Sequence, residues 1–274
     1  MSMTKLWTIL LVAVLAAGTA AIVSNCGGSS SGDDDSSDDA GDDTGDDTGG
    51  DDTGDVLWGH VRNFQDKQDL SGIDVELLNN DTGEPFDPAI TGVSDSDGYI
   101  AFNVPAGFAE VAVRTTSAGF MNTLHYSYAR NATDEEFLIV SDQTISIVSN
   151  LLGVTLDDSL SHAAGAVYWG SESDENPIGC ATVAFDPAAT EIHYFGSDAL
   201  PTHDRDTLGT NKDNGYFIGL NVDVVPTVMT AEANGHQSVV NVPKLYAKTV
   251  VIQNFYYSKA DYSSLDQLQS GSCE

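Results

Sequence analysis

Five side chains that could hold a metal ion lie close together in one segment, residues 186–209. They are Glu191, His193, His203, Asp204 and Asp206. Imidazole nitrogens and carboxylate oxygens are the donors that Zn²⁺ and similar ions take in proteins. In a chain this acidic, however, histidine falls next to aspartate by chance, and loops collect polar residues without any ion. We therefore prefer an ordinary polar loop, expect no cofactor, and keep the five residues as candidate ligands.

A second acidic cluster, Asp95-Ser96-Asp97-Gly98, resembles half of a calcium loop. Aspartate side chains also accept hydrogen bonds from backbone amides in tight turns, and glycine takes the positive φ that such turns need. We interpret the cluster as a turn rather than a cation site. No set of residues in the sequence identifies a reaction, so we predict that the protein is not an enzyme.

The net charge also restricts the partners. Ten Lys and Arg oppose 42 Asp and Glu, which gives a formal charge of −32. A chain with this balance would repel a polyanion and could neutralise few phosphates. We expect no nucleic acid among its partners, and instead a membrane contacted through a lipid anchor, with a protein or polysaccharide ligand at the cell surface.

The anchor is predicted from residues 1–26. Lys5 precedes an uncharged apolar run that ends at Val23-Ser24-Asn25-Cys26. This segment resembles a bacterial lipoprotein signal peptide, whose cysteine is lipidated and becomes the mature N-terminus. The resemblance implies lipidation of Cys26 and a place in the cell envelope, at the outer membrane. The alternative is an uncleaved membrane-spanning anchor, for which about 18 apolar residues are long enough.

Residues 27–55 contain only Gly, Ser, Thr and Asp apart from one Ala and carry 12 acidic residues between Asp33 and Asp55. Such a composition buries no apolar surface, and its like charges extend the chain, so we predict a disordered tether. The repeated Asp-Asp-Thr-Gly pattern leaves calcium binding as an alternative. The three acids at 33–35 resemble a signal that accompanies display of lipoproteins on the cell surface.

From residue 56 onward the sequence predicts strands, and a distinctive stretch occurs twice. Ile73, Val75 and Leu77 alternate with acidic residues, as in a strand with one buried face. The turn residues Asp97 and Gly98 precede Tyr99-Ile100 in residues 94–104, and Asp213 and Gly215 precede Tyr216-Phe217 in residues 211–222. The chain therefore contains one β-fold twice.

The segment 141–162 connects the two copies. Its apolar residues at 145, 148, 151 and 152 have helical spacing, with Ser141 as candidate N-cap and Gly153 just past the end. We predict a short helix here, although its β-branched residues would also suit a strand.

Both copies resemble the carboxypeptidase regulatory-like domain, a prealbumin-like β-sandwich. The shared pattern is G-x-V, a strand carrying valine, an Asp-Gly-Tyr turn, and a strand ending in glycine. It corresponds to Gly59 and Val61, residues 72–75, 94–99 and 119–120, and then to Gly165 and Val167, residues 179–183, 210–216 and 235–236. The resemblance implies a structural module without peptidase activity. The second copy departs from it in the long loop 186–209 and at His236.

We therefore predict an all-β protein with two tandem Ig-like or prealbumin-like sandwiches after a disordered acidic linker, with a short connecting helix. The predicted domains are 56–140 and 163–259, and 260–274 forms a polar tail. If Cys26 is lipidated, Cys180 and Cys273 remain as an even pair in an oxidising compartment, where a disulfide persists. A free, buried Cys180 is the alternative.

The predicted function is a non-catalytic, membrane-anchored lipoprotein with a binding or scaffolding role. The alternative is a carbohydrate-binding or metal-dependent module that uses the loop 186–209.

Overall fold

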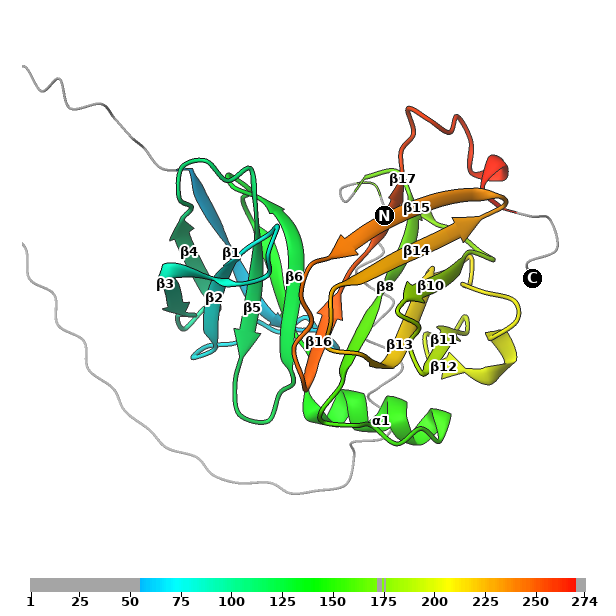
Figure 1. Cartoon of the computed structure of the whole chain (residues 1–274), viewed down its shortest axis with the longest axis horizontal. Coiled ribbons are helices and arrows are strands. Elements are labelled where there is room, and N and C mark those ends of the chain that lie inside the picture. Colours follow the sequence, from blue (N-terminus) through cyan, green and yellow to red (C-terminus); the bar gives the residue numbers. More distant parts are fainter. Residues whose placement is uncertain (1–54, 172–173, 175, 270–274) are drawn as a thin grey trace, which may run out of the picture. The chain divides into compact units, whose positions relative to one another are not determined.

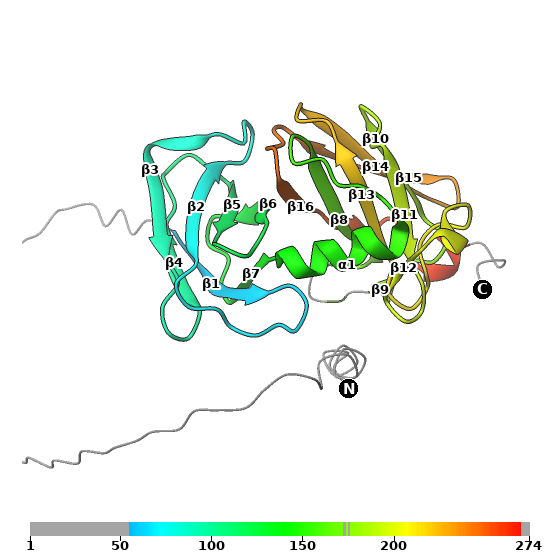
Figure 2. The same ribbon diagram turned by 90° about the horizontal axis from the view of Figure 1, so that it is seen from below.

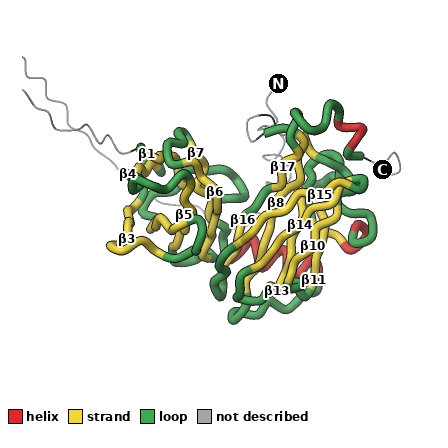
Figure 3. The backbone as a smooth tube through the Cα atoms, turned by 45° about the horizontal axis from the view of Figure 1, so that its top comes forward, coloured by secondary structure: helices red, strands yellow, loops and turns green. Residues whose placement is uncertain are grey.

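The computed structural model describes residues 55–171, 174 and 176–269. The predicted leader, the lipidation site Cys26, all of the tether except Asp55, and Cys273 lie outside the described residues. Strands are the main secondary structure of both halves, and helix is confined to short segments (Figure 3). The predicted all-β fold is confirmed.

The first half contains seven strands. They are β1 Val56–Asn63, β2 Asp74–Asn79, β3 Pro85–Val93, β4 Tyr99–Asn103, β5 Glu110–Thr116, β6 Asn122–Ala129 and β7 Glu135–Ile139. One sheet has the order β4-β1-β7, with β1 antiparallel to β4 and parallel to β7. The other runs β3-β2-β5-β6. Leu57, Val75 and Phe137 belong to the core between them and are almost completely buried, as the alternation around Val75 predicts.

The described residues of the second half form ten strands and two short 3₁₀ helices. They are β8 Ser161–Trp169, β9 Asn176–Pro177, β10 Thr182–Asp186, β11 Glu191–Phe195, β12 Pro201–Thr202, η2 His203–Arg205, β13 Tyr216–Val222, β14 Thr227–Ala233, β15 His236–Val242, β16 Thr249–Ile252, β17 Phe255–Tyr257 and η3 Leu265–Gln267. β8 is antiparallel to β13 and parallel to β16, as β1 is to β4 and β7. β10-β14-β15 repeats the order β2-β5-β6. The sequence repeat is therefore a repeat of strand pairing.

The repeated turn makes the same backbone contact in both halves. The Val61 amide donates to the Gly98 carbonyl at 2.8 Å, and the Val167 amide donates to the Gly215 carbonyl at 3.0 Å. Gly98 and Gly215 have φ of 75° and 69°, in the left-handed region that favours glycine. The turn that delivers β4 or β13 is thus fixed directly to the valine of the G-x-V motif.

The hydroxyl group of the residue that begins each turn, Ser94 or Thr210, holds a neighbouring loop by hydrogen bonds. Ser94 Oγ accepts from the Ile73 amide at 3.0 Å and donates to the Leu70 carbonyl at 2.7 Å. Thr210 Oγ1 accepts from the Ala181 amide at 3.0 Å and donates to a carbonyl at 2.6 Å. Both hydroxyl groups are buried, so their hydrogen bonds satisfy backbone groups that water cannot reach.

One strand joins the halves. β16 pairs in parallel with β8 on one side and with β6 on the other, so the three strands lie side by side (Figure 1). The Tyr126 hydroxyl donates to the Lys244 carbonyl at 2.7 Å, and Lys244 Nζ lies 2.6 Å from Glu84 Oε1. Domains 56–140 and 163–259 thus share a ladder and a contact region. Their independent folding stays a prediction.

The predicted helix is confirmed as α1, Asp142–Leu152. Ser141 Oγ accepts from the Thr144 amide, and Gly153 ends the helix with φ 66°. Ile145, Val148 and Leu152 are buried against strands of both halves. The helix runs from the end of β7 towards β12 (Figure 2). No helix in the described part of the chain combines the length and the apolar character needed to cross a bilayer.

Two segments differ from their sequence-based interpretation. The loop 186–209 contains β11, β12 and η2, and β11 pairs with β13, whereas its positional counterpart β3 pairs with β2. The beginning of the predicted polar tail packs against the second half. Leu268 is buried there, and the Tyr262 carbonyl accepts from Trp169 Nε1 at 2.9 Å. Isolated apolar residues in a polar stretch gave no periodicity from which to predict this.

We expect Gly215→Ala to destabilise the fold more than Gly107→Ala does. Both glycines have positive φ, which costs an alanine about 1–2 kcal/mol. A Cβ at Gly215 would also lie 2.7 Å from the Val167 carbonyl oxygen, whereas one at Gly107 would meet nothing within 4 Å. Chemical denaturation should show an extra loss of about 1 kcal/mol for the Gly215 variant. Equal losses would mean that the turn is not held against β8.

We expect the free energy of unfolding to decrease as the pH falls, because of His125. Burial, followed by the charge of Lys67, lowers the pKa of His125 to about 4 from 6.5, while the Leu138 backbone and Glu136 act in the opposite direction. Its Nε2 has no hydrogen-bond partner among the described residues. Between pH 6.5 and 4 the unfolded chain therefore binds a proton that the folded chain does not, which removes up to roughly 3 kcal/mol as the pH falls.

Unfolding of the wild type and His125→Leu between pH 7 and 4 measures this contribution. The variant should lose less stability on acidification. Some slope should remain, because burial also lowers the pKa of His162. The same slope in both proteins would contradict the assignment to His125.

Candidate metal centre

The β11–β12 hairpin brings the candidate ligands together. Glu191 and His193 lie two residues apart on β11, so their side chains project from the same face of the strand. β12 pairs back onto β11, with Thr202 opposite Tyr194. η2 begins directly after β12, and Thr202 Oγ1 caps it by accepting from the Asp204 amide at 3.2 Å. The hairpin therefore places His203 and Asp206 beside His193.

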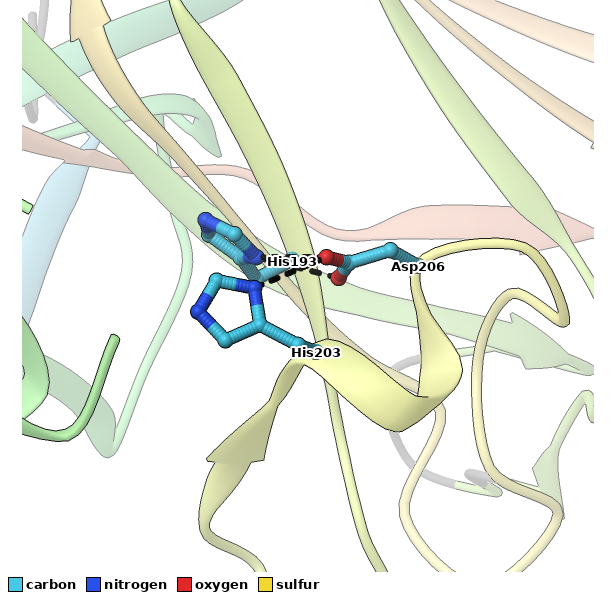
Figure 4. Close-up of side chains that lie close together, drawn as sticks. All are labelled: His193, His203 and Asp206. Atoms are coloured by element: carbon cyan, nitrogen blue, oxygen red, sulfur yellow. Dashed lines mark hydrogen bonds and ion pairs between the residues drawn. The ribbon is translucent and has the colours of Figure 1, made fainter. Parts of the chain in front are cut away.

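His193 lies at the centre of the cluster, with 4% of its side chain exposed. Its Nδ1 is 3.0 Å and 3.1 Å from the two carboxylate oxygens of Asp206. Its Nε2 is 2.9 Å from Glu191 Oε2. Figure 4 shows the carboxylate of Asp206 beside His193. Both ring nitrogens of a buried histidine thus face carboxylates.

His203 approaches the same carboxylate from η2 (Figure 4). Its Nδ1 is 3.1 Å from Asp206 Oδ2, and its Nε2 is 2.9 Å from the carbonyl of Leu152, the last residue of α1. The two imidazole rings meet edge to face with centroids 4.8 Å apart. Without an ion in the cluster, the Leu152 carbonyl and then Asp206 raise the pKa of His203.

The structure brings together only some of the ligands predicted from the sequence. His193, His203 and Asp206 each offer a donor atom, and these atoms lie within 4.8 Å of one another. Glu191 contacts the far nitrogen of His193, while Asp204 is not part of the converging group. The role of the Leu152 carbonyl could not be predicted from the sequence, because a backbone acceptor at a helix end is recognised only once the helix is placed.

Arg205 holds the segment that carries the cluster. Its side chain is buried, and its Nε and Nη2 donate to the carbonyls of Gly209 and Thr210 at 3.0 Å and 2.8 Å. Thr210 is the hydroxyl residue of the repeated turn. Arg205 therefore fixes η2 to the residue that begins the repeated turn of the second half, a role that sequence analysis missed.

In both repeated turns a side-chain oxygen bonds to the backbone of the turn. Asp95 Oδ1 accepts from the amides of Asp97 and Tyr99, both at 2.9 Å, and Asn211 Oδ1 accepts from the Asp213 amide at 2.7 Å. The cap in the first copy is therefore Asp95. Its Oδ1 thus accepts from two backbone amides of the same turn.

Cys180, at the end of the turn before β10, is disulfide-bonded. Its partner lies outside the described residues, so pairing with Cys273 stays a prediction.

Tyrosine side chains of both halves take part in several packing and hydrogen-bond contacts. Tyr126 and Tyr257 are buried and donate to backbone carbonyls. Tyr168 and Tyr256 stack at an interplanar angle of 25°, with centroids 5.8 Å apart, and Tyr168 is itself buried. These positions fit packing between strands better than an exposed platform.

Comparison with known proteins assigns no function. No family model and no curated protein match this chain. Among solved structures, the chain is similar to the Bacillus anthracis TIE protein, with 9% identity, a TM-score of 0.23, and 73% of this chain and 33% of that one covered. It therefore spans about a third of that protein.

The chain is similar to two pilins at about the same level. For the minor pilin GBS52 of Streptococcus agalactiae the identity is 9% and the TM-score 0.22, with 73% of this chain and 95% of that one covered. For the shaft pilin SpaA of Lactobacillus rhamnosus GG the values are 10%, 0.23, 74% and 98%. Similarity at this level provides no residue correspondence.

We expect Arg205→Met to destabilise the second half. The variant removes the buried guanidinium that donates to the carbonyls of Gly209 and Thr210. We expect the free energy of unfolding to decrease by roughly 1–3 kcal/mol. Lys248→Met is the matched control, because Lys248 is exposed and its contact with Asp158 spans 3.5 Å. Thermal melts that show the same midpoint for both variants would contradict the role given to Arg205.

Proposed function

We propose that this protein is a non-catalytic lipoprotein that displays two β-sandwich modules at the cell envelope, where they bind or scaffold another molecule. The observation that carries the proposal is the order of segments: an apolar leader ends at Cys26, an acidic stretch follows, and strands begin at residue 56. Several acyl chains on one cysteine anchor a protein stably, whereas a single chain binds only marginally.

The polar side chains within the sandwiches support a structural role for the modules. Ser94 and Thr210 satisfy backbone groups of the repeated turns, and the Tyr257 hydroxyl donates to the Ala231 carbonyl at 2.8 Å. In each case the polar atom stabilises the fold.

We further propose that each half is a carboxypeptidase regulatory-like domain. The glycines of the two G-x-V motifs support this. A Cβ at Gly59 would collide with the Glu135 carbonyl, and one at Gly165 with the Gln253 carbonyl. Both halves thus need glycine at the same point for the same reason, which is close approach of the backbone on the parallel side of β1 and β8.

The placement in the envelope is proposed from the leader and tether. The acids at 33–35 support display at the outer surface of the outer membrane, and like charges would hold residues 27–55 extended between lipid and module. A protein or polysaccharide of the cell surface is the proposed ligand class.

A metal-dependent module is the second candidate function. It is favoured by one observation, the convergence of His193, His203 and Asp206 at the end of the β11–β12 hairpin.

We expect Cys26→Ala to abolish anchoring. Cells grown with a labelled fatty acid should label the wild-type protein and leave the variant unlabelled, with its leader uncleaved by the lipoprotein signal peptidase. Cys180→Ala is the control, since it also removes a cysteine but should keep the label. Acyl labelling that persists in Cys26→Ala would refute the lipoprotein proposal.

A further inference from the structure

We propose that His193, His203 and Asp206 bind a divalent transition-metal ion, best matched by Zn²⁺, with Glu191 and the Leu152 carbonyl orienting the two histidines. The site goes beyond the proposed envelope function, because a scaffold needs no ion. It rests on how the two imidazoles are held rather than on the mere presence of polar residues.

In each histidine, Nε2 lies within hydrogen-bond distance of an acceptor oxygen. Nε2 of His193 is 2.9 Å from Glu191 Oε2, and Nε2 of His203 is 2.9 Å from the Leu152 carbonyl. Metal-binding histidines characteristically donate their second N–H to a carboxylate or a backbone carbonyl, which fixes the tautomer and the ring orientation. Both arrangements occur here, one on each ring.

That tautomer directs both Nδ1 lone pairs at a single carboxylate. Nδ1 of His193 and Nδ1 of His203 lie 3.0 Å and 3.1 Å from oxygens of Asp206. A lone pair facing a carboxylate oxygen at this distance is repulsive unless a proton or a cation lies between them. Protons on both nitrogens would place two imidazolium rings edge to face at 4.8 Å, whereas one cation shared by the three donors satisfies all of them.

The donor set selects the type of ion. Ca²⁺ and Mg²⁺ take oxygen ligands, whereas two imidazoles and a carboxylate suit Zn²⁺ and its neighbours in the transition series. Zn–N and Zn–O bonds of about 2.0–2.1 Å separate tetrahedral donors by roughly 3.3 Å. Nδ1 of each histidine lies 3.1 Å from the same atom, Asp206 Oδ2, so these N···O distances need to open by only a few tenths of an ångström. All three donor atoms lie within 4.8 Å of one another.

Burial and charge complete the site. His193 is buried, while 31% of the Asp206 side chain and 58% of the His203 side chain are exposed, so an ion can enter from the His203 side. Three protein donors leave the fourth tetrahedral position for water. The carboxylates of Asp206 and Glu191 together balance a charge of 2+.

Titration of the full chain in detergent, stripped of metal with a chelator, tests the proposal. Calorimetry with zinc chloride should show one site that calcium chloride does not fill. His203→Ala and Asp206→Asn should each weaken Zn²⁺ binding by about 100-fold or more, and Glu191→Gln by about 10-fold, the range seen when groups that orient a ligand are removed. His193 is left intact, since its burial makes a folding defect the expected result of replacing it.

Matched controls separate this site from general binding by acidic or histidine residues. Asp204→Asn changes a carboxylate two residues from Asp206, and His236→Ala removes an exposed histidine of the same half. Both should bind Zn²⁺ within about twofold of the wild type, a margin small beside the hundredfold losses expected of ligand variants. Binding of Co²⁺ should give a visible absorption band that His203→Ala lacks.

Three results would overturn the proposal. They are no Zn²⁺ binding by the wild type, equal Zn²⁺ affinity in the wild type and His203→Ala, and equal responses to Zn²⁺ and Ca²⁺. Any of them would mean that the two imidazoles share protons, not an ion, with Asp206.

Discussion

Both halves depend on one backbone hydrogen bond. It runs from the valine of the G-x-V motif to the glycine of the Asp-Gly-Tyr turn in the first half and of the Asn-Gly-Tyr turn in the second. It joins Val61 to Gly98 and Val167 to Gly215. Only a residue that accepts left-handed φ without a Cβ can bring its carbonyl to this place, and the strand that follows then pairs antiparallel with β1 or β8. The turn thereby sets the register of one sheet in each half.

One difference between the halves, the connection before the repeated turn, determines where the histidine cluster lies. In the first half, β3 returns along β2, whereas in the second half β11 pairs with β13 and so joins the other sheet. The change of partner places β11 beside β12 and η2. Arg205 fixes η2 to Thr210, which begins the turn that both halves share. The histidine cluster exists in only one half because only there does this connection change sheets.

A second long-range feature ties the halves to each other. β16 completes the second half as β7 completes the first, yet its other edge is covered by β6. Pairing in this way covers edges that would otherwise present free amide and carbonyl groups to other chains, a common hazard of β-proteins. The helix α1, which connects the halves in sequence, ends at Leu152, whose carbonyl lies 2.9 Å from His203 Nε2.

The sequence by itself determined the features that depend on nearby residues. The buried positions at and just before β2 follow from the alternation of Ile73, Val75 and Leu77, and the ends of α1 follow from the caps Ser141 and Gly153. The two turns follow from the positive φ of the glycines at 98 and 215. Each of these effects acts over only a few positions. The sequence also identified the five polar residues of 186–209 as candidates. Only the tertiary structure decided that three of them converge and that Asp204 does not.

The reason is that this convergence requires choices between partners far apart in the chain. β11 could pair with β10 or β13, β16 could end a sheet or continue into β6, and Leu268 could be solvated or buried. None of these outcomes changes the local pattern of residues, because each is decided by which distant apolar surface and which unpaired backbone edge become available on folding.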